Sequence, residues 1–153
     1  MEFKLKNKQT IMNPSSYGFS HKFLFTINEL NELSCLSSQD LQLAWKKNGF
    51  ELGRLYTLDN LVVFQSYLGF VKIFNHQGEQ VELTACEEKC FFSSSINCDN
   101  DIFVINNKDS EGISYQARLC EYDQEKRKIN TKAFDISGNA RLLNREYFII
   151  RHN

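Results

Sequence analysis

The sequence predicts an α+β domain, mainly an antiparallel β meander or small barrel, with a short helical pair near the N-terminus. Three observations predict it. Short apolar runs bounded by turn residues fill the chain beyond residue 53, whereas residues 26–50 carry apolar side chains at helical spacing. The chain has 153 residues, of which 42% are hydrophobic and 24% charged, and this suits one globular core. No linker or internal repeat divides it, so we expect a single domain over residues 1–153.

The strands are predicted by apolar runs, several of which alternate with polar residues. The expected strands are 61–64, 70–74, 81–83, 102–105, 113–122, 129–136 and 147–150. Asn75 to Gly78 has the composition of a hairpin turn between two of them. At the N-terminus, Phe3 and Leu5 alternate with lysines, which predicts an edge strand over 3–8.

The first helix of the predicted pair begins near Thr26. Thr26 and Glu29 have the spacing of a capping box, in which each side chain satisfies a free backbone N–H at the start of a helix. Leu30 and Leu33 follow three residues apart, as on one helical face. We therefore expect a short helix here.

A second helix is predicted over 38–47. A serine at 37 or 38 suits its N-terminal cap, and the Asn-Gly pair at 48–49 suits a left-handed stop. Leu41, Ala44 and Trp45 would share one apolar face of this helix. We expect Trp45 to be buried against the sheet.

The helical pair resembles the helix-turn-helix of winged regulators. The residues that carry the resemblance are Thr26, Glu29, Leu30, Leu33, Leu36, Ser37 and Leu41. It implies a recognition helix over 38–47 in the major groove of DNA. The side chains that would contact bases or phosphates are Gln39, Gln42, Lys46 and Lys47. Two positions depart from the pattern, since Asn31 replaces a small apolar residue and Cys35 replaces the usual turn glycine.

The charges of the chain nearly cancel. Its 18 Lys and Arg against 19 Asp and Glu give a formal net charge of −1, so no overall positive field draws it to nucleic acid or anionic lipid. The N-terminus lacks the apolar core of a signal peptide, and no apolar run is long enough to span a bilayer. The 5 cysteines include no C-x-x-C pair, so we expect reduced thiols, a cytoplasmic location and no membrane association.

The candidate metal ligands are not spaced as zinc ligands usually are. Cys86, Cys90 and Cys98 could join His76 in a set of four donors, but structural zinc sites bring their cysteines in close pairs. We interpret the cysteines as ordinary core or loop thiols, and expect neither metal nor disulfide. The acidic run at 99–101 is interpreted as a solvated turn before a strand.

Catalytic residues are not recognisable either. Nucleophilic catalysis needs a Ser or Cys beside a fixed His. His152 adjoins the C-terminus and His76 falls in a predicted turn, and neither position favours a rigid base. The fingerprints of hydrolases, metalloproteases and nucleotide-binding proteins do not occur. We assign no catalytic residue and no cofactor.

Elimination leaves a non-enzymatic protein-binding domain, such as an inhibitor, immunity protein, adaptor or assembly subunit, as the main hypothesis. The 13 Phe and 6 Tyr are compatible with it, because both residues are common at protein interfaces. DNA binding through residues 26–50 is the alternative, and an enzyme with an unrecognised site is the third hypothesis. They require, respectively, an exposed apolar patch, an exposed helix beside a basic wing, and a deep pocket with convergent polar groups.

Overall fold

The computed structural model describes residues 16–83, 90–96, 101–108, 114–135, 139–142 and 148–151. These residues form strands and turns but no helix, and every strand pairing among them is antiparallel. The α+β class expected from the sequence is therefore wrong, because the region of the predicted helical pair consists of strands. The edge strand expected over 3–8 lies outside the described residues.

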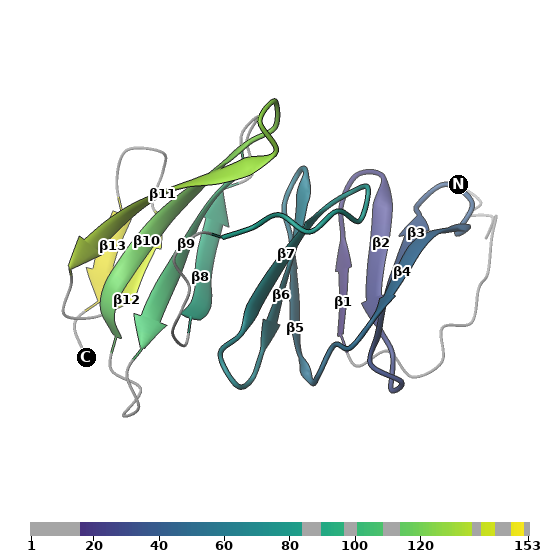
Figure 1. The fold of residues 1–153 in the computed structure, drawn as a ribbon, viewed down its shortest axis with the longest axis horizontal. Coiled ribbons are helices and arrows are strands. Elements are labelled where there is room, and N and C mark those ends of the chain that lie inside the picture. Colours follow the sequence, from purple (N-terminus) through teal and green to yellow (C-terminus); the bar gives the residue numbers. More distant parts are fainter. Residues whose placement is uncertain are drawn as a thin grey trace, which may run out of the picture.

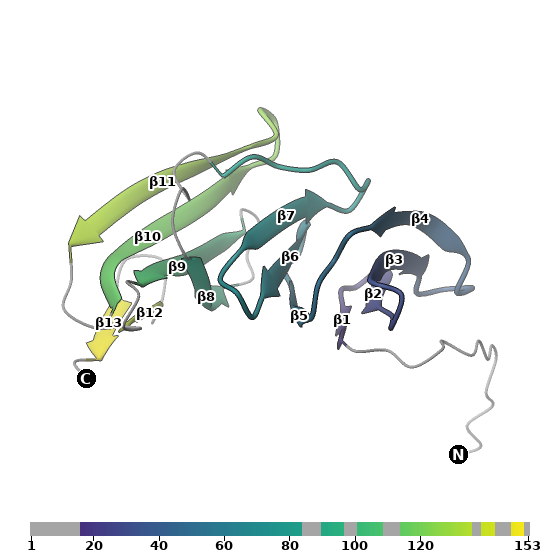
Figure 2. The ribbon, with the colours of Figure 1, turned by 60° about the horizontal axis from the view of Figure 1, so that its bottom comes forward.

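The strands form four consecutive antiparallel sheets. The first contains β1 (Ser16–Phe19), β2 (Phe23–Ile27), β3 (Glu32–Ser37) and β4 (Leu43–Asn48). The second contains β5 (Gly53–Thr57), β6 (Leu61–Ser66) and β7 (Val71–Asn75). The third contains β8 (Cys90–Ile96), β9 (Ile102–Lys108), β10 (Ser114–Asp123) and β11 (Lys128–Asp135), and the last contains β12 (Asn139–Leu142) and β13 (Phe148–Arg151). Within each sheet the strands pair in chain order, and the sheets stand in a row (Figures 1 and 2).

Each sheet packs a face against the next one, and a separate apolar cluster fills each junction. The cluster between the first two sheets contains Phe25, Ile27, Leu33, Cys35, Phe50, Leu55, Val62, Phe64 and Phe74. The cluster between the second and third contains Leu58, Leu61, Val63, Ile73, Val81, Cys90, Phe103, Ile105, Cys120, Tyr122 and Ile129. The last junction has a smaller one of Val104, Ala117 and Ala140, with Leu119 beside it.

The first strands of the first two sheets, β1 and β5, approach closely because Gly18 of β1 has no side chain. A Cβ at this position would come within 2.6 Å of the Thr57 Cγ2, well inside van der Waals contact. The Thr57 hydroxyl donates a hydrogen bond of 2.7 Å to the Phe19 carbonyl, and the Leu55 amide donates one of 3.0 Å to Ser16 Oγ. These contacts join β1 to β5.

A tight turn replaces the first predicted helix. The Asn28 side-chain oxygen accepts hydrogen bonds from the backbone amides of Leu30 (3.0 Å) and Glu32 (3.1 Å), and Asn31 adopts a left-handed conformation with φ of 60°. Asparagine suits both roles, because its short side chain bonds to nearby backbone and tolerates positive φ. The spacing of Thr26 and Glu29 is therefore coincidental, because Thr26 lies in the buried strand β2 and Glu29 lies in the turn.

The second predicted helix is also a turn followed by a strand. Ser37 Oγ accepts a hydrogen bond from the Gln39 amide (3.2 Å), and Asp40 accepts one from the Gln42 amide (3.1 Å). Trp45 then lies on β4, half-buried against the cluster between the first two sheets. The expectation that Trp45 is buried against the sheet from a helix is met only in part, because the side chain is half-buried and lies on a strand.

Most of the expected strands beyond residue 60 are confirmed, namely those of β6, β7, β9, β10, β11 and β13. The hairpin turn after β7 is confirmed as well, because the Gly78 amide donates to the Asn75 carbonyl (3.0 Å) and Gly78 adopts φ of 83°. Residues 81–83 do not form a strand. The return from this turn contains a single bridge between Phe74 and Gln80, with backbone hydrogen bonds from the Asn75 amide to the Glu79 carbonyl and from the Val81 amide to the Ile73 carbonyl. Among the described residues, no helix has the length and apolarity needed to cross a membrane.

Candidate functional site

Turns from three sheets surround a polar pocket of about 510 Å³ at one end of the molecule. It is lined by residues 20–23 between β1 and β2, 59–60 between β5 and β6, 75–77 at the end of β7, and 122, 124 and 127 at the β10–β11 hairpin. Because successive strands are antiparallel, these turns all lie at the same end of their sheets, the upper end in Figure 1. A pocket assembled in this way has four separate backbone segments as walls.

Asp101 holds the wall of the pocket that residues 59–60 form. Its carboxylate is fully buried and accepts hydrogen bonds of 2.8 Å from the backbone amides of Asp59 and Asn60. Burial raises the pKa of the Asp101 carboxyl to about 6, although the two amide donors favour the charged form. The solvated turn expected here is therefore wrong for Asp101, which instead connects the start of β9 to the β5–β6 turn.

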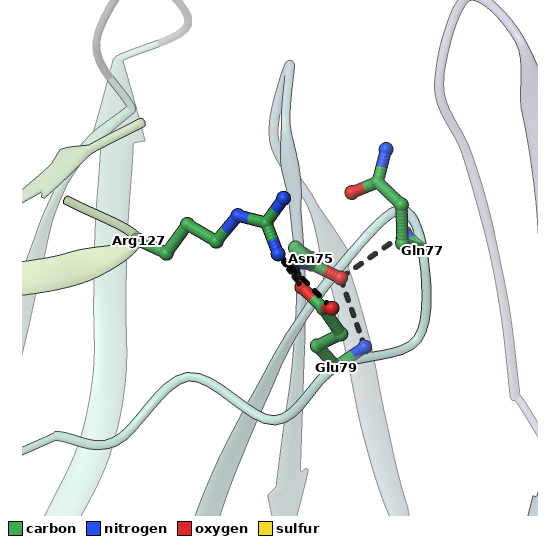
Figure 3. A network of polar contacts seen from close by, with 4 residues as sticks. All are labelled: Asn75, Gln77, Glu79 and Arg127. Atoms are coloured by element: carbon green, nitrogen blue, oxygen red, sulfur yellow. Dashed lines mark hydrogen bonds and ion pairs between the residues drawn. The ribbon is translucent and has the colours of Figure 1, made fainter. Parts of the chain in front are cut away.

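Asn75 and Glu79 fix a second wall. The Asn75 side-chain oxygen accepts from the backbone amides of Gln77 (3.1 Å) and Glu79 (2.9 Å), and its amide nitrogen donates to Glu79 Oε2 at 2.7 Å. Arg127 donates to both oxygens of the Glu79 carboxylate, at 3.0 and 2.8 Å, and so connects this turn to the β10–β11 hairpin (Figure 3). Asn75 is buried, whereas the Arg127–Glu79 pair is largely exposed.

His76 packs beside two neighbouring aromatic rings on the pocket wall. Its imidazole lies 5.1 Å from the Phe23 ring and 5.5 Å from the Phe25 ring, and its carbonyl accepts a 2.8 Å hydrogen bond from the Trp45 indole nitrogen. Burial lowers the pKa of His76 to about 4, so the ring is neutral near pH 7. Its Nε2 atom is buried and has no hydrogen-bond partner among the described residues. The sequence predicts that His76 falls in a turn, which is correct, but the packing of its ring against Phe23 and Phe25 was not expected.

Two charged groups on the pocket walls act on His76 from opposite directions. Asp59 favours the protonated imidazole and Lys22 disfavours it, so both lie within electrostatic reach of the ring. No ion pair joins Lys22 to Asp59 in the part of the chain that the structure describes. The pocket therefore presents separate positive and negative groups.

The opposite end of the sheets is apolar. Five large apolar side chains are exposed there, on the β2–β3 turn, the β4–β5 connection and the β6–β7 turn: Leu30 (77% exposed), Leu52 (66%), Tyr67 (63%), Leu68 (59%) and Phe70 (62%). We call them the apolar end. It is the lower end of the first two sheets in Figure 1.

Backbone hydrogen bonds connect the loops of the apolar end. The Phe50 amide donates to the Asn31 carbonyl (3.0 Å), and the Tyr67 amide donates to the Leu52 carbonyl (3.2 Å). The Cys90 amide donates to the Gly69 carbonyl (2.9 Å), which extends the connections to the third sheet. The three loops therefore form a continuous surface whose shape does not depend on their exposed side chains.

The predicted DNA-contacting residues do not lie on one recognition surface. Gln39 and Gln42 belong to the β3–β4 turn region, whereas Lys46 and Lys47 point to opposite faces of β4. Lys46 forms an ion pair with Glu32 at 2.7 Å, and Lys47 lies 5.5 Å from the centre of the Phe74 ring. The winged helix-turn-helix interpretation is wrong, because it requires a helix over residues that form β4.

The predicted zinc ligands are only partly described. His76 packs against aromatic rings, and Cys90 is disulfide-bonded, while Cys86 and Cys98 lie outside the described residues. The expectation that every thiol is reduced is therefore wrong for Cys90. Cys35 and Cys120 are free and buried, and burial raises the pKa of each thiol to about 12, which leaves both unreactive near neutral pH.

Comparison with protein-family models and with curated proteins finds no match. Among solved structures, the chain is similar to the computationally designed Ika4 protein, with TM-score 0.47, 14% identity, and coverage of 88% of this chain and 96% of that one. It is also similar to KlHsv2 with loop 6CD replaced by a Gly-Ser linker, with TM-score 0.49 and 10% identity over 86% of this chain. The third is BamB from Moraxella catarrhalis, with TM-score 0.45 and 9% identity over 82% of this chain. The chain spans only 42% and 51% of the latter two, and scores this low support no functional inference.

Proposed function

We propose that this chain is a non-enzymatic protein-binding domain whose partner docks on the apolar end. One observation carries the proposal: five large apolar side chains from three separate loops stand exposed together. Leaving such groups in water forgoes roughly 25 cal/mol for each Å² of apolar surface. Clustered exposure of this kind is typical of interaction sites, whereas scattered single apolar residues are ordinary.

The surroundings of the apolar end favour a protein over a lipid surface. Glu29 and Glu51 are exposed beside Leu30 and Leu52, so carboxylates interrupt the patch. Arg54 lies on the same side, with its guanidinium 6.0 Å from the centre of the Tyr67 ring. Charges of both signs around an aromatic and aliphatic centre match a protein interface, whereas binding to anionic lipid calls for clustered Lys and Arg.

A photo-crosslinker placed at position 68 tests the proposal. In extract of the source cells, we expect one discrete adduct that disappears when Tyr67 and Phe70 are both changed to Ser. The matched control carries the crosslinker at Glu125, an exposed residue of the β10–β11 turn at the opposite end. Equal adducts from both positions, or an adduct that survives the double substitution, would exclude the apolar end as the docking site.

The cytoplasmic location expected from the sequence is a separate prediction. It depended on reduced thiols, and the disulfide at Cys90 favours an oxidising compartment instead. Protein binding through the apolar end is compatible with either compartment, because no group in that patch changes its chemistry with redox state.

A further inference from the structure

We propose that the polar pocket binds a small zwitterion that carries an ammonium and a carboxylate, such as a free amino acid. This site is independent of the apolar end, which lies at the other end of the sheets (Figure 1). Asp59 would receive the ammonium and Lys22 the carboxylate. Both residues line the pocket, and among the described residues their side chains do not form an ion pair with each other.

The placement of the two charges is what selects a zwitterion. Both line the pocket together with His76, from turns that belong to different sheets, so one small ligand can contact both charges at once. A ligand with a single negative charge would gain from Lys22 and be repelled by Asp59. A ligand with a single positive charge would be attracted by Asp59 and repelled by Lys22.

The remaining charged groups of the pocket disfavour a phosphate relative to a zwitterion. Arg127 is the side chain with the geometry to bind phosphate, yet its Nη1 already donates to both oxygens of the Glu79 carboxylate, at 3.0 and 2.8 Å, so its charge is largely balanced within the chain. A phosphate would also have to approach the Asp59 carboxylate. An amino acid needs only one carboxylate-binding cation, which Lys22 supplies.

The size and rigidity of the pocket suit a small molecule. Its volume of about 510 Å³ falls within the usual range for small-molecule sites, roughly 300–1,000 Å³. The backbone of the 59–60 wall is bonded to Asp101, and that of the 75–77 wall is bonded to the Asn75 side chain. The Phe23 ring adds an apolar surface against which a ligand side chain can pack. Binding would therefore require little ordering of the walls, which favours affinity.

Calorimetric titration of the full chain with each of the twenty common amino acids tests the proposal. We expect at least one to bind, and expect Asp59→Asn and Lys22→Gln each to weaken it at least tenfold. Neither substitution removes a hydrogen bond on which the fold depends, because the wall at Asp59 is held through its backbone amide and Lys22 is exposed. Lys126→Gln, in the β10–β11 turn but outside the pocket lining, is the matched control and should bind as the wild type does.

Two derivatives of the bound amino acid assign each charge to its partner. The N-acetyl derivative lacks the ammonium and should bind the wild type at least tenfold more weakly, with little further loss in Asp59→Asn. The amide derivative lacks the carboxylate and should behave in the same way with Lys22→Gln. The proposal is overturned if no amino acid binds at about 10 mM, if binding is indifferent to both substitutions, or if inorganic phosphate or glucose binds more tightly than any amino acid.

Discussion

The loops at the two ends of the sheets are held by different kinds of hydrogen bond. At the polar end, buried side chains bond to backbone: Asp101 holds the amides of residues 59 and 60, and Asn75 holds those of residues 77 and 79. At the apolar end, backbone bonds to backbone between the loops, as between Phe50 and Asn31 or Tyr67 and Leu52, while the Asn28 and Ser66 side chains bond to backbone within single turns. The five exposed apolar side chains make none of these hydrogen bonds and are available for contact with a partner.

This difference has a direct consequence for mutation. A side chain that satisfies buried amides cannot be removed without leaving them unpaired, which costs about 1–3 kcal/mol for each group. A side chain that stands in water can be changed at little cost. We therefore expect stability to be sensitive to substitution at the polar end and binding to be sensitive at the apolar end.

The largest expected effect is the loss of Asp101. Changing Asp101 to Ala leaves the amides of Asp59 and Asn60 without their acceptor, and should lower the free energy of unfolding by about 2–4 kcal/mol. Urea unfolding measures this change. Asp101→Asn is the matched control, since it keeps one acceptor oxygen and the shape of the side chain. A loss below about 1 kcal/mol in the alanine variant would show that the two hydrogen bonds do not hold this wall.

The second prediction concerns pH between about 4 and 6.5. The Asp101 carboxyl has a pKa raised from 3.8 to about 6 on folding, so the folded state binds the extra proton and stability falls as pH rises. The His76 imidazole has a pKa lowered from 6.5 to about 4, so the unfolded state binds the extra proton and stability rises with pH. In the wild type these opposite slopes largely cancel.

Single variants should expose the two slopes. Asp101→Asn should become more stable as pH rises across this window, whereas His76→Gln should become less stable. Urea unfolding at about pH 4.5, 5.5 and 6.5 measures both. Slopes of the same sign in the two variants would contradict the buried, neutral state of the His76 ring or of the Asp101 carboxyl.

Asn75 should have a smaller effect than Asp101, because its contacts are those of a neutral amide. Asn75→Ala removes the acceptor for the Gln77 and Glu79 amides, and should cost about 1–2 kcal/mol in urea unfolding. Arg127→Ala breaks only an exposed ion pair with Glu79 and should cost less than about 1 kcal/mol. An equal loss in both variants would mean that the hairpin contact, and not the turn, stabilises this wall.

The apolar end should show the smallest change in stability. Tyr67→Ser and Phe70→Ser together should alter the free energy of unfolding by no more than about 0.5 kcal/mol, because both side chains are largely exposed. The same pair of changes should remove the crosslinked adduct described above. A large loss of stability would show that these side chains pack within the fold, and would contradict the expected difference in stability effects between the two ends.

Most of the strands beyond residue 60 could be predicted because their signals are local. Asn75 and Gly78 enforce a turn through their own side chain and backbone preferences, and β10 and β11 are joined by a short polar turn whose Asp123 accepts from the Lys126 amide (2.9 Å). Such features depend on residues a few positions apart, so a single sequence contains them.

The first sheet could not be predicted because apolar side chains lie on both of its faces. In the observed register, Phe19, Leu24, Leu36 and Leu43 lie opposite one another on the face turned away from the second sheet. Alternation with polar residues, which identifies a half-buried strand, is therefore lost, and the remaining spacing fits a helix by coincidence. Asp101 was missed for a different reason: its burial depends on the turn at residues 59–60, which is distant in sequence.

The division of the core into separate clusters implies an order of unfolding. Each cluster joins a sheet only to its neighbours in the row, so the stability of the described chain is close to a sum of adjacent terms, as in a linear array of repeats. Among the described residues, the last junction is built on Val104, Ala117 and Ala140 and supplemented by two hydrogen bonds between Asn106 and the Ala140 backbone, at 3.1 and 3.3 Å. The hairpin of β12 and β13 has only two strands, fewer than any other described sheet, so it should detach first, and its amides should exchange with solvent deuterium sooner than those of β6, which has neighbours on both faces.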